Sequence, residues 1–112
     1  MELPAKVKYW LDIADYDLDT ALVMLEGKRF LYVGFMCHQV VEKSLKACCA
    51  AQSDEMPPYT HNLSQLAKKT NLYQLFSDQQ KDLLDLLEPL NVEARYPTHK
   101  EKISKSLSAE KC

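Results

Sequence analysis

The feature that most constrains the fold is an apolar run over residues 31–51, which has the periodicity of a single α-helix. Apolar or small residues recur along it with a helical period, at positions 33, 36, 37, 40, 41, 44, 47, 48 and 51. Its polar residues form only a narrow stripe, made of His38, Gln39, Glu42, Lys43 and Lys46. Because most of the circumference of this helix is apolar, we expect it to lie at the centre of a helical bundle.

The segment before this run predicts a second long helix, over residues 4–26. Its apolar residues keep the i, i+3, i+4, i+7 spacing along the whole segment, and aspartates mark the opposite face. Pro4 suits the first turn of a helix, and Gly27 suits a left-handed residue just after the last turn. We therefore expect a hairpin of two long helices with a short connection.

The segment that follows the apolar run predicts a loop and then a short helix. Residues 52–59 contain two consecutive prolines, which end a helix and are typical of an exposed loop. Thr60 is expected to cap the next helix, which ends near Asn71. This loop joins the two halves of the chain.

Two capping boxes predict the remaining helices. The S-x-x-Q pattern at residues 77–80 opens a fourth helix that runs to about residue 90, where Pro89 should distort the last turn. A second capping box at residues 98–101 opens a short helix through about residue 107. The periodicity thus predicts four to five helices.

The whole chain, residues 1–112, is expected to form a single all-α domain. A length of 112 residues suits one ordinary domain, and an apolar content of 46% is enough for a core. The chain has only two glycines, whereas a β-sandwich needs turn residues about every 8–12 positions. The formal net charge of −2 argues against nucleic-acid binding that is driven by bulk charge.

The sequence also indicates where the protein works and what it does not bind. No stretch approaches the roughly 20 apolar residues of a membrane span, and the start lacks a secretory apolar segment, so we expect a cytoplasmic protein without membrane contact. The cysteines lack C-x2-C spacing, and the histidines are too far apart in sequence for a zinc motif. No glycine-rich phosphate loop is present. We therefore expect no metal and no cofactor.

Three stretches together resemble the HEPN family, named for higher eukaryotes and prokaryotes nucleotide-binding. They are YWLxxAxxD at residues 9–17, FMCHQVVEKxLKA at 35–47, and YTHNL at 59–63 followed by EARYP at 93–97. The resemblance covers nearly the whole chain. It implies an up-and-down bundle of four or five helices that is commonly a homodimer. Because HEPN proteins usually have a longer final helix, we expect a truncated or incompletely represented C-terminus.

The resemblance implies three functions between which the sequence does not choose. Some HEPN proteins act with a minimal nucleotidyltransferase partner, as in a toxin–antitoxin pair. Many others are metal-independent endoribonucleases, and others are non-catalytic nucleotide-binding or assembly modules. Our leading hypothesis is a nucleotide- or RNA-associated HEPN protein with a nucleotidyltransferase partner. The alternatives are the endoribonuclease and the helical dimerisation or assembly module.

The endoribonuclease alternative depends on Arg95 and His99. An imidazole can take the proton of a ribose 2′-OH, and a guanidinium can hold the phosphate that this oxygen attacks. The spacing is Arg-x3-His, however, which is one residue shorter than the Arg-x4-6-His motif of the family nucleases. Pro97 also interrupts a helix between the two residues. The sequence therefore argues against an enzyme. In the non-catalytic interpretation, Arg95 forms an ion pair and His99 lies in the solvent-exposed first turn of a helix.

A polar site is indicated on the central helix. The spacing of His38, Glu42 and Lys46 places the three side chains on one face, where His38 and Glu42 can orient each other as base and carboxylate. A structural polar stripe is the simplest interpretation of this row. A polar row is costly on so apolar a helix, however, which also points to a polar ligand pocket or a dimer contact, and a nucleotide or RNA phosphate would be placed here if one binds.

The loop and the C-terminal segment supply three further candidate residues. His61 follows the expected cap and would contact either the loop or a ligand phosphate at the helix N-terminus. Tyr59 and Tyr96 would stack on bases, or else serve as packing anchors beside proline-containing segments.

Overall fold

The structure is a computed structural model, and it describes residues 3–90 of the 112-residue chain. The predicted helix over residues 98–107 lies outside this part. Three predicted site residues, Arg95, Tyr96 and His99, also lie outside it.

Four α-helices make up the described part of the chain. They are α1 (Ala5–Glu26), α2 (Phe30–Gln52), α3 (Leu63–Lys69) and α4 (Asp78–Leu87), with a short 3-10 helix η1 (Tyr73–Leu75) between the last two. Residues 3–90 contain no β-strand. The all-α, HEPN-like helical bundle predicted from the sequence is therefore confirmed, although η1 was not predicted.

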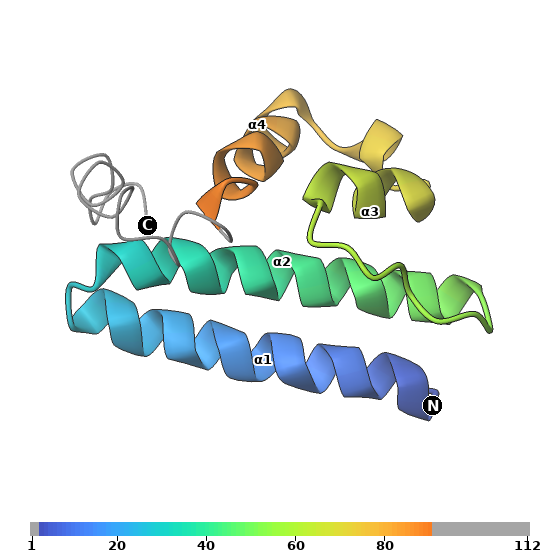
Figure 1. Ribbon diagram of the computed structural model, residues 1–112, viewed down its shortest axis with the longest axis horizontal. Coiled ribbons are helices and arrows are strands. Elements are labelled where there is room, and N and C mark those ends of the chain that lie inside the picture. Colours follow the sequence, from blue (N-terminus) through green and yellow to red (C-terminus); the bar gives the residue numbers. More distant parts are fainter. Residues whose placement is uncertain (1–2, 91–112) are drawn as a thin grey trace.

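Helix α2 lies in the middle of the molecule, as its almost fully apolar circumference predicted. Figure 1 shows α1 and α2 side by side and antiparallel, with α3 and α4 on the opposite side of α2 from α1. The contacts agree, because α2 packs against α1, α3 and α4. The loop between α2 and α3 runs back along α2 and brings residues 59–62 over the middle of that helix.

The core divides into two apolar clusters, one on each side of α2. The larger cluster joins α2 to α3 and α4 through leucines that include Leu45, Leu63 and Leu66. The smaller one joins α1 to α2 and is built on Val7, Ala47 and Ala50. On α2 this smaller cluster consists of the small side chains of Ala47 and Ala50. No helix within residues 3–90 is both long enough and apolar enough to cross a membrane.

The turn after α1 differs from the prediction. Gly27 has φ −81°, and the left-handed residue is Lys28, with φ 58°. The N–H of Gly27 still bonds to the carbonyl of Val23 at 3.0 Å, so Gly27 continues the helical hydrogen bonding. The chain therefore reverses one residue later than the glycine indicated.

The cap of α3 also differs from the prediction, whereas the cap of α4 agrees with it. Asn62 caps α3, because its side chain accepts the N–H of Gln65 at 2.9 Å. The hydroxyl of Thr60 accepts the N–H of Asn62 at 3.1 Å and thereby shapes the preceding loop. The predicted capping box of α4 is confirmed at Ser77 and Gln80, and α4 ends at residue 87, ahead of Pro89.

Candidate functional site

The polar stripe of α2 is buried beneath the loop that leads into α3. His38 and Glu42 have no exposed surface, and Lys46 is also buried. Buried charged and polar side chains are costly unless they are paired, so the contacts of this stripe decide what it is for.

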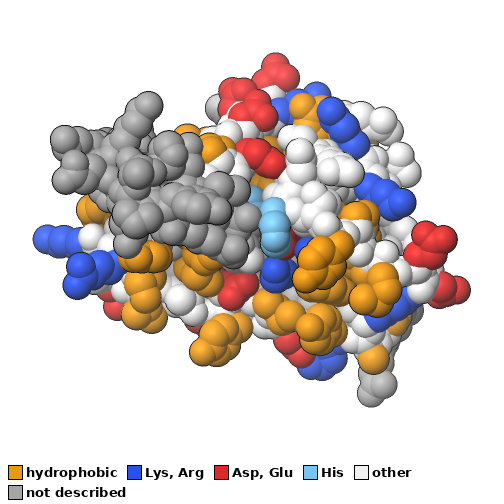
Figure 2. Space-filling view, in the orientation of Figure 1, with side chains coloured by type: hydrophobic (Ala, Val, Ile, Leu, Met, Phe, Trp, Pro, Cys, Tyr) orange, Lys and Arg blue, Asp and Glu red, His pale blue; other side chains and the backbone are white. Residues whose placement is uncertain are grey.

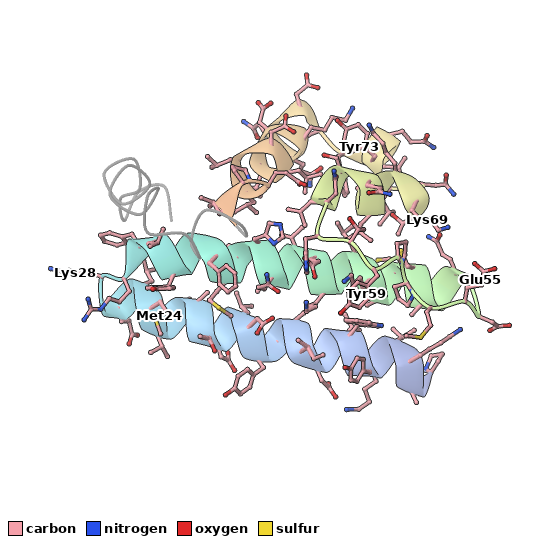
Figure 3. All side chains as sticks on the ribbon, in the orientation of Figure 1. Met24, Lys28, Glu55, Tyr59, Lys69 and Tyr73 are labelled. Carbon is pink, nitrogen blue, oxygen red and sulfur yellow. The ribbon has the colours of Figure 1, made fainter. Side chains whose placement is uncertain are left out.

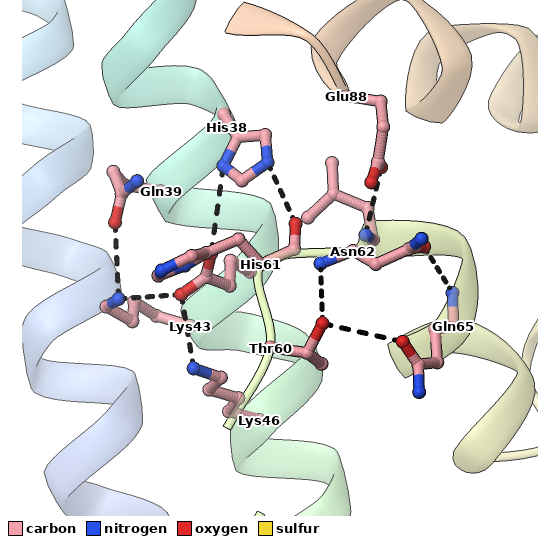
Figure 4. A network of polar contacts seen from close by, with 11 residues as sticks. His38, Gln39, Lys43, Lys46, Thr60, His61, Asn62, Gln65 and Glu88 are labelled. Carbon is pink, nitrogen blue, oxygen red and sulfur yellow. Dashed lines mark hydrogen bonds and ion pairs between the residues drawn. The ribbon is translucent and has the colours of Figure 1, made fainter. Parts of the chain in front are cut away.

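The carboxylate of Glu42 is the centre of a network of polar contacts (Figure 4). Its Oε1 accepts a hydrogen bond from Nδ1 of His61 at 2.8 Å. Its Oε2 accepts from Nζ of Lys43 at 2.9 Å and from Nζ of Lys46 at 3.2 Å. Both oxygens of the buried carboxylate are therefore satisfied, one by the loop and the other by α2 itself.

This environment keeps Glu42 ionised. Burial alone would raise the pKa of the carboxyl group, but the hydrogen bonds from Lys43 and His61 and the charges of Lys43 and Lys46 outweigh it. The net effect is a pKa below the ordinary value of 4.5. Glu42 is thus a buried anion at neutral pH, and it orients every donor that faces it.

His38 holds the loop from the opposite side. Its Nε2 lies 3.2 Å from the carbonyl oxygen of His61, and because a carbonyl only accepts, Nε2 carries the hydrogen. Burial lowers the pKa of His38, and the charge of Glu42 opposes this effect only in part. Nδ1 of His38 has no hydrogen-bond partner among the described residues, and it lies 3.8 Å from Oε1 of Glu42. His38 is therefore a neutral imidazole that fixes the loop backbone.

The imidazole that Glu42 orients is thus His61 on the loop. The sequence predicted the pair His38 and Glu42 from their spacing on one helix, but their 3.8 Å separation is too long for a hydrogen bond. Unlike His38, the His61 side chain is 53% exposed. Figure 2 shows histidine atoms at the surface near the middle of one face, with a basic side chain and hydrophobic side chains beside them.

The surroundings of the site are close to electrically balanced. Lys43 and Lys46 face Glu42, and Asp17 on α1 interacts electrostatically with Lys43 and Glu42. Burial raises the pKa of Asp17, an effect that the charge of Lys43 opposes. A ligand would therefore meet specific donors and acceptors here rather than a strong positive field.

Glu88 connects α4 to the same region. Its Oε2 accepts the N–H of Leu63, the first residue of α3, at 2.9 Å. Burial raises the pKa of Glu88, and the hydrogen bond from Leu63 opposes that effect. Because the N–H groups in the first turn of a helix lack intrahelical partners, this carboxylate stabilises the start of α3 directly after the loop.

The structure thus brings five of the predicted site residues into one region. His38, Glu42, Lys46 and His61 are linked by the contacts described above. Tyr59 stands at the edge of this group, with its ring centroid 6.0 Å from Nζ of Lys46.

Sequence reasoning missed Trp10, whose ring centroid on α1 lies 5.4 Å from the same ammonium. Helical periodicity assigned Trp10 only an apolar face, and no local pattern reveals a contact with a residue 36 positions away. Within residues 3–90, no cluster of three or more histidine, cysteine, aspartate or glutamate side chains could hold a metal ion.

Comparison with known families identifies the class of protein. A family model described as HEPN domain matches residues 7–112. The chain therefore belongs to the HEPN family, in agreement with the three stretches of sequence that resemble it. Searches of curated proteins and of solved structures gave no match.

The central role of Glu42 predicts a large loss of stability in Glu42→Gln. The amide cannot balance the ammonium groups of Lys43 and Lys46, so we expect the free energy of unfolding to fall by about 3 kcal/mol in urea denaturation. Asp12→Asn is the matched control, because it breaks an exposed ion pair with Lys8 and should change stability little. Equal stability of Glu42→Gln and the wild-type protein would contradict this account.

The lowered pKa of His38 leads us to expect a loss of stability on mild acidification. Its pKa in the folded protein lies below the ordinary value of 6.5, so the unfolded chain binds the extra proton first as the pH falls. The free energy of unfolding should therefore be constant above pH 6.5 as far as His38 is concerned. Below that pH it should fall by up to about 1.4 kcal/mol per pH unit.

Urea denaturation of wild type and His38→Gln between pH 7 and 5 measures this effect. The variant should have the smaller slope, because glutamine does not titrate and retains an N–H donor for the loop carbonyl. Glu42, whose pKa lies below 4.5, contributes mainly at lower pH. The same slope in both proteins would contradict the assignment to His38.

Proposed function

We propose that this HEPN protein binds a nucleotide or RNA at the site around His61 and acts with a nucleotidyltransferase partner, as in a toxin–antitoxin pair. The observation that carries the proposal is the pairing of a half-exposed imidazole with a fully buried carboxylate. Glu42 holds Nδ1 of His61, which leaves Nε2 as the ring nitrogen available to a ligand. A neutral Nε2 accepts from a ribose hydroxyl, and a protonated one donates to a phosphate.

The position of His61 supports this proposal. The residue lies on the loop directly ahead of α3, and its backbone carbonyl and its side chain are both held from α2. A ligand would therefore meet an imidazole that is already oriented, which lowers the entropic cost of binding. The partner in the proposal comes from family membership, because some HEPN proteins act with a minimal nucleotidyltransferase.

The endoribonuclease is the second candidate, and the same pair of residues favours it. A buried carboxylate bonded to Nδ1 of an exposed histidine orients the imidazole for proton transfer through Nε2. His61 would then supply acid–base chemistry in addition to Arg95 and His99, which lie outside the described residues. The assembly module remains the third alternative, without ligand or cleavage.

Binding is tested with a fluorescently labelled single-stranded RNA and with labelled AMP, read by anisotropy. We expect His61→Gln to weaken binding about tenfold or more, because a hydrogen bond to a charged group contributes about 1.5 kcal/mol or more. Gln79→Ala, an exposed position on α4, should bind like wild type. Equal affinities of wild type and a folded His61→Gln variant would contradict the proposed site.

The same RNA, end-labelled and incubated in chelator, separates the two candidates. Cleavage by wild type that is lost in Arg95→Ala, His99→Ala and His61→Gln would establish the endoribonuclease. Binding without cleavage is the expected outcome of the partner-dependent function. We expect a neighbouring gene to encode a small nucleotidyltransferase. Co-expression with that protein should give a complex that co-elutes, and separate elution would contradict the partner.

We also propose that the protein is a homodimer, which the outer surface of α1 supports. Tyr16, Leu22 and Val23 are exposed large apolar residues on this helix. Light scattering at micromolar concentration should give the mass of two chains, and Val23→Glu should shift it toward one. Leu75→Glu, at an exposed position on η1, is the matched control and should leave the dimer intact. A monomeric wild type would contradict the homodimer.

A further inference from the structure

A hollow lies next to the His61 site, and Trp10, Lys46 and Tyr59, whose contacts are described above, form part of its lining. It has a volume of about 440 Å³ and lies between the start of α1, the second half of α2 and the loop at residues 54–59. Its lining includes Tyr9, Trp10, Lys46, Met56 and Tyr59. Its walls thus come from three separate parts of the chain.

Three large side chains around the hollow are strongly exposed, whereas Trp10 is partly buried. Tyr59 is fully exposed, Met56 is almost fully exposed, and more than half of Tyr9 is accessible. The Tyr9 and Trp10 rings meet edge to face, with centroids 5.0 Å apart and an interplanar angle of 79°. Large apolar side chains that gather in this way around a hollow are typical of a surface that a ligand covers.

Lys46 links the hollow to the polar site. Its ammonium donates to Glu42 and at the same time lies 5.4 Å from the centroid of Trp10 and 6.0 Å from that of Tyr59. Tyr59 is also only two residues from His61. A ligand that contacts the His61 imidazole can therefore extend directly onto the two rings.

The hollow is bounded by a contact between α1 and the end of α2. Nζ of Lys6 donates to the carbonyl oxygen of Ser53 at 2.7 Å and lies 3.1 Å from Oδ1 of Asp54. Both lysines that line the hollow are thus paired with a carboxylate, Lys6 with Asp54 and Lys46 with Glu42. Glu55 adds a further acidic side chain to the lining. The hollow therefore suits a neutral, flat group better than an anionic one.

We propose that the hollow receives one unpaired nucleobase of the nucleotide or single-stranded RNA that contacts His61. The inference rests on the proposed function and adds to it the group that is recognised and the residues that recognise it. The base stacks on the rings of Tyr59 and Trp10, and its sugar and phosphate extend toward His61. Every base has a stacking face, so the site accepts all four and favours the larger purines.

Trp10 provides a direct test, because it is the only tryptophan of the chain. Intrinsic fluorescence is measured while AMP, UMP, ribose 5-phosphate or a short single-stranded RNA is added, with free N-acetyltryptophanamide as the control for absorbance by the bases. We expect saturable quenching by the RNA and by AMP, weaker quenching by UMP and none by ribose 5-phosphate.

Tyr59→Ala should weaken the affinity for AMP, measured by fluorescence quenching, about tenfold, because the variant removes one stacking surface. Tyr59 is fully exposed, so the variant is expected to fold, and its melting temperature checks this. Tyr73→Ala is the control: lysine ammonium groups also lie 4.9 Å from that ring, but it is on the far side of α3 (Figure 3). Tyr73 packs against the larger apolar cluster, so the melting temperature of this variant is measured as well. Binding by Tyr73→Ala should equal that of wild type.

The outcomes separate this inference from the proposed function. Anisotropy that shows His61-dependent RNA binding, with Trp10 fluorescence unchanged or with Tyr59→Ala as tight as wild type, would overturn the base site alone. If neither anisotropy nor Trp10 fluorescence detects binding, both the proposed function and the base site are overturned. Quenching that is equal for AMP and ribose 5-phosphate would overturn stacking, because only the first carries a base.

Discussion

A fully buried carboxylate must be surrounded by donors, and the arrangement of this protein around α2 follows from that requirement. An ionised group without partners in an apolar interior would cost several kcal/mol, which is a large part of the stability of a small domain. Helix α2 alone supplies two lysine ammonium groups, both to Oε2 of Glu42. The other oxygen is met from outside the helix, by the ring of His61. The hydrogen bond between the His61 ring and the buried Glu42 carboxylate therefore holds the loop against the centre of the bundle.

The path of the chain beyond α2 is consistent with this attachment. His61 is held twice, through its backbone by His38 and through its ring by Glu42. Asn62 then caps α3, and Glu88 reaches from α4 to the N–H of Leu63. Three consecutive residues thus connect the loop to α2, α3 and α4. A site at this point is rigid because side chains from separate helices determine the position of its backbone.

The sequence predicts the helices better than it predicts the site. The apolar period of residues 31–51 placed α2 at the centre, and the capping box at Ser77 placed the start of α4. Local patterns were less certain at the turns, where Lys28 rather than Gly27 adopts the left-handed conformation. Thr60 and Asn62 can both cap α3 by local side-chain hydrogen bonding. Asn62 is the cap in the structure, and tertiary contacts that a local pattern does not contain decide between the two.

The partners within the site could not be predicted for a different reason. Spacing on one helix suggested that Glu42 pairs with His38, but it carries no information on a residue 19 positions away in a loop. Similarly, Trp10 and Tyr59 are 49 positions apart in the sequence, and only the tertiary fold places both beside Lys46. Helical periodicity determines which residues share a face. The partner that covers that face is determined by the whole chain.

The shared position of Lys46 gives a physical reason for the two parts of the proposed site to act together. Its ammonium donates a hydrogen bond to the Glu42 carboxylate and also lies near the rings of Trp10 and Tyr59. The Lys46 side chain is 8% exposed, and a base that covers Tyr59 and Trp10 would remove this remaining exposure. The interaction between opposite charges strengthens as the local dielectric constant falls. A more tightly held Glu42 would in turn orient His61 more firmly. Binding in the hollow and contact at the imidazole would then reinforce each other, because both act on the same buried ion pair.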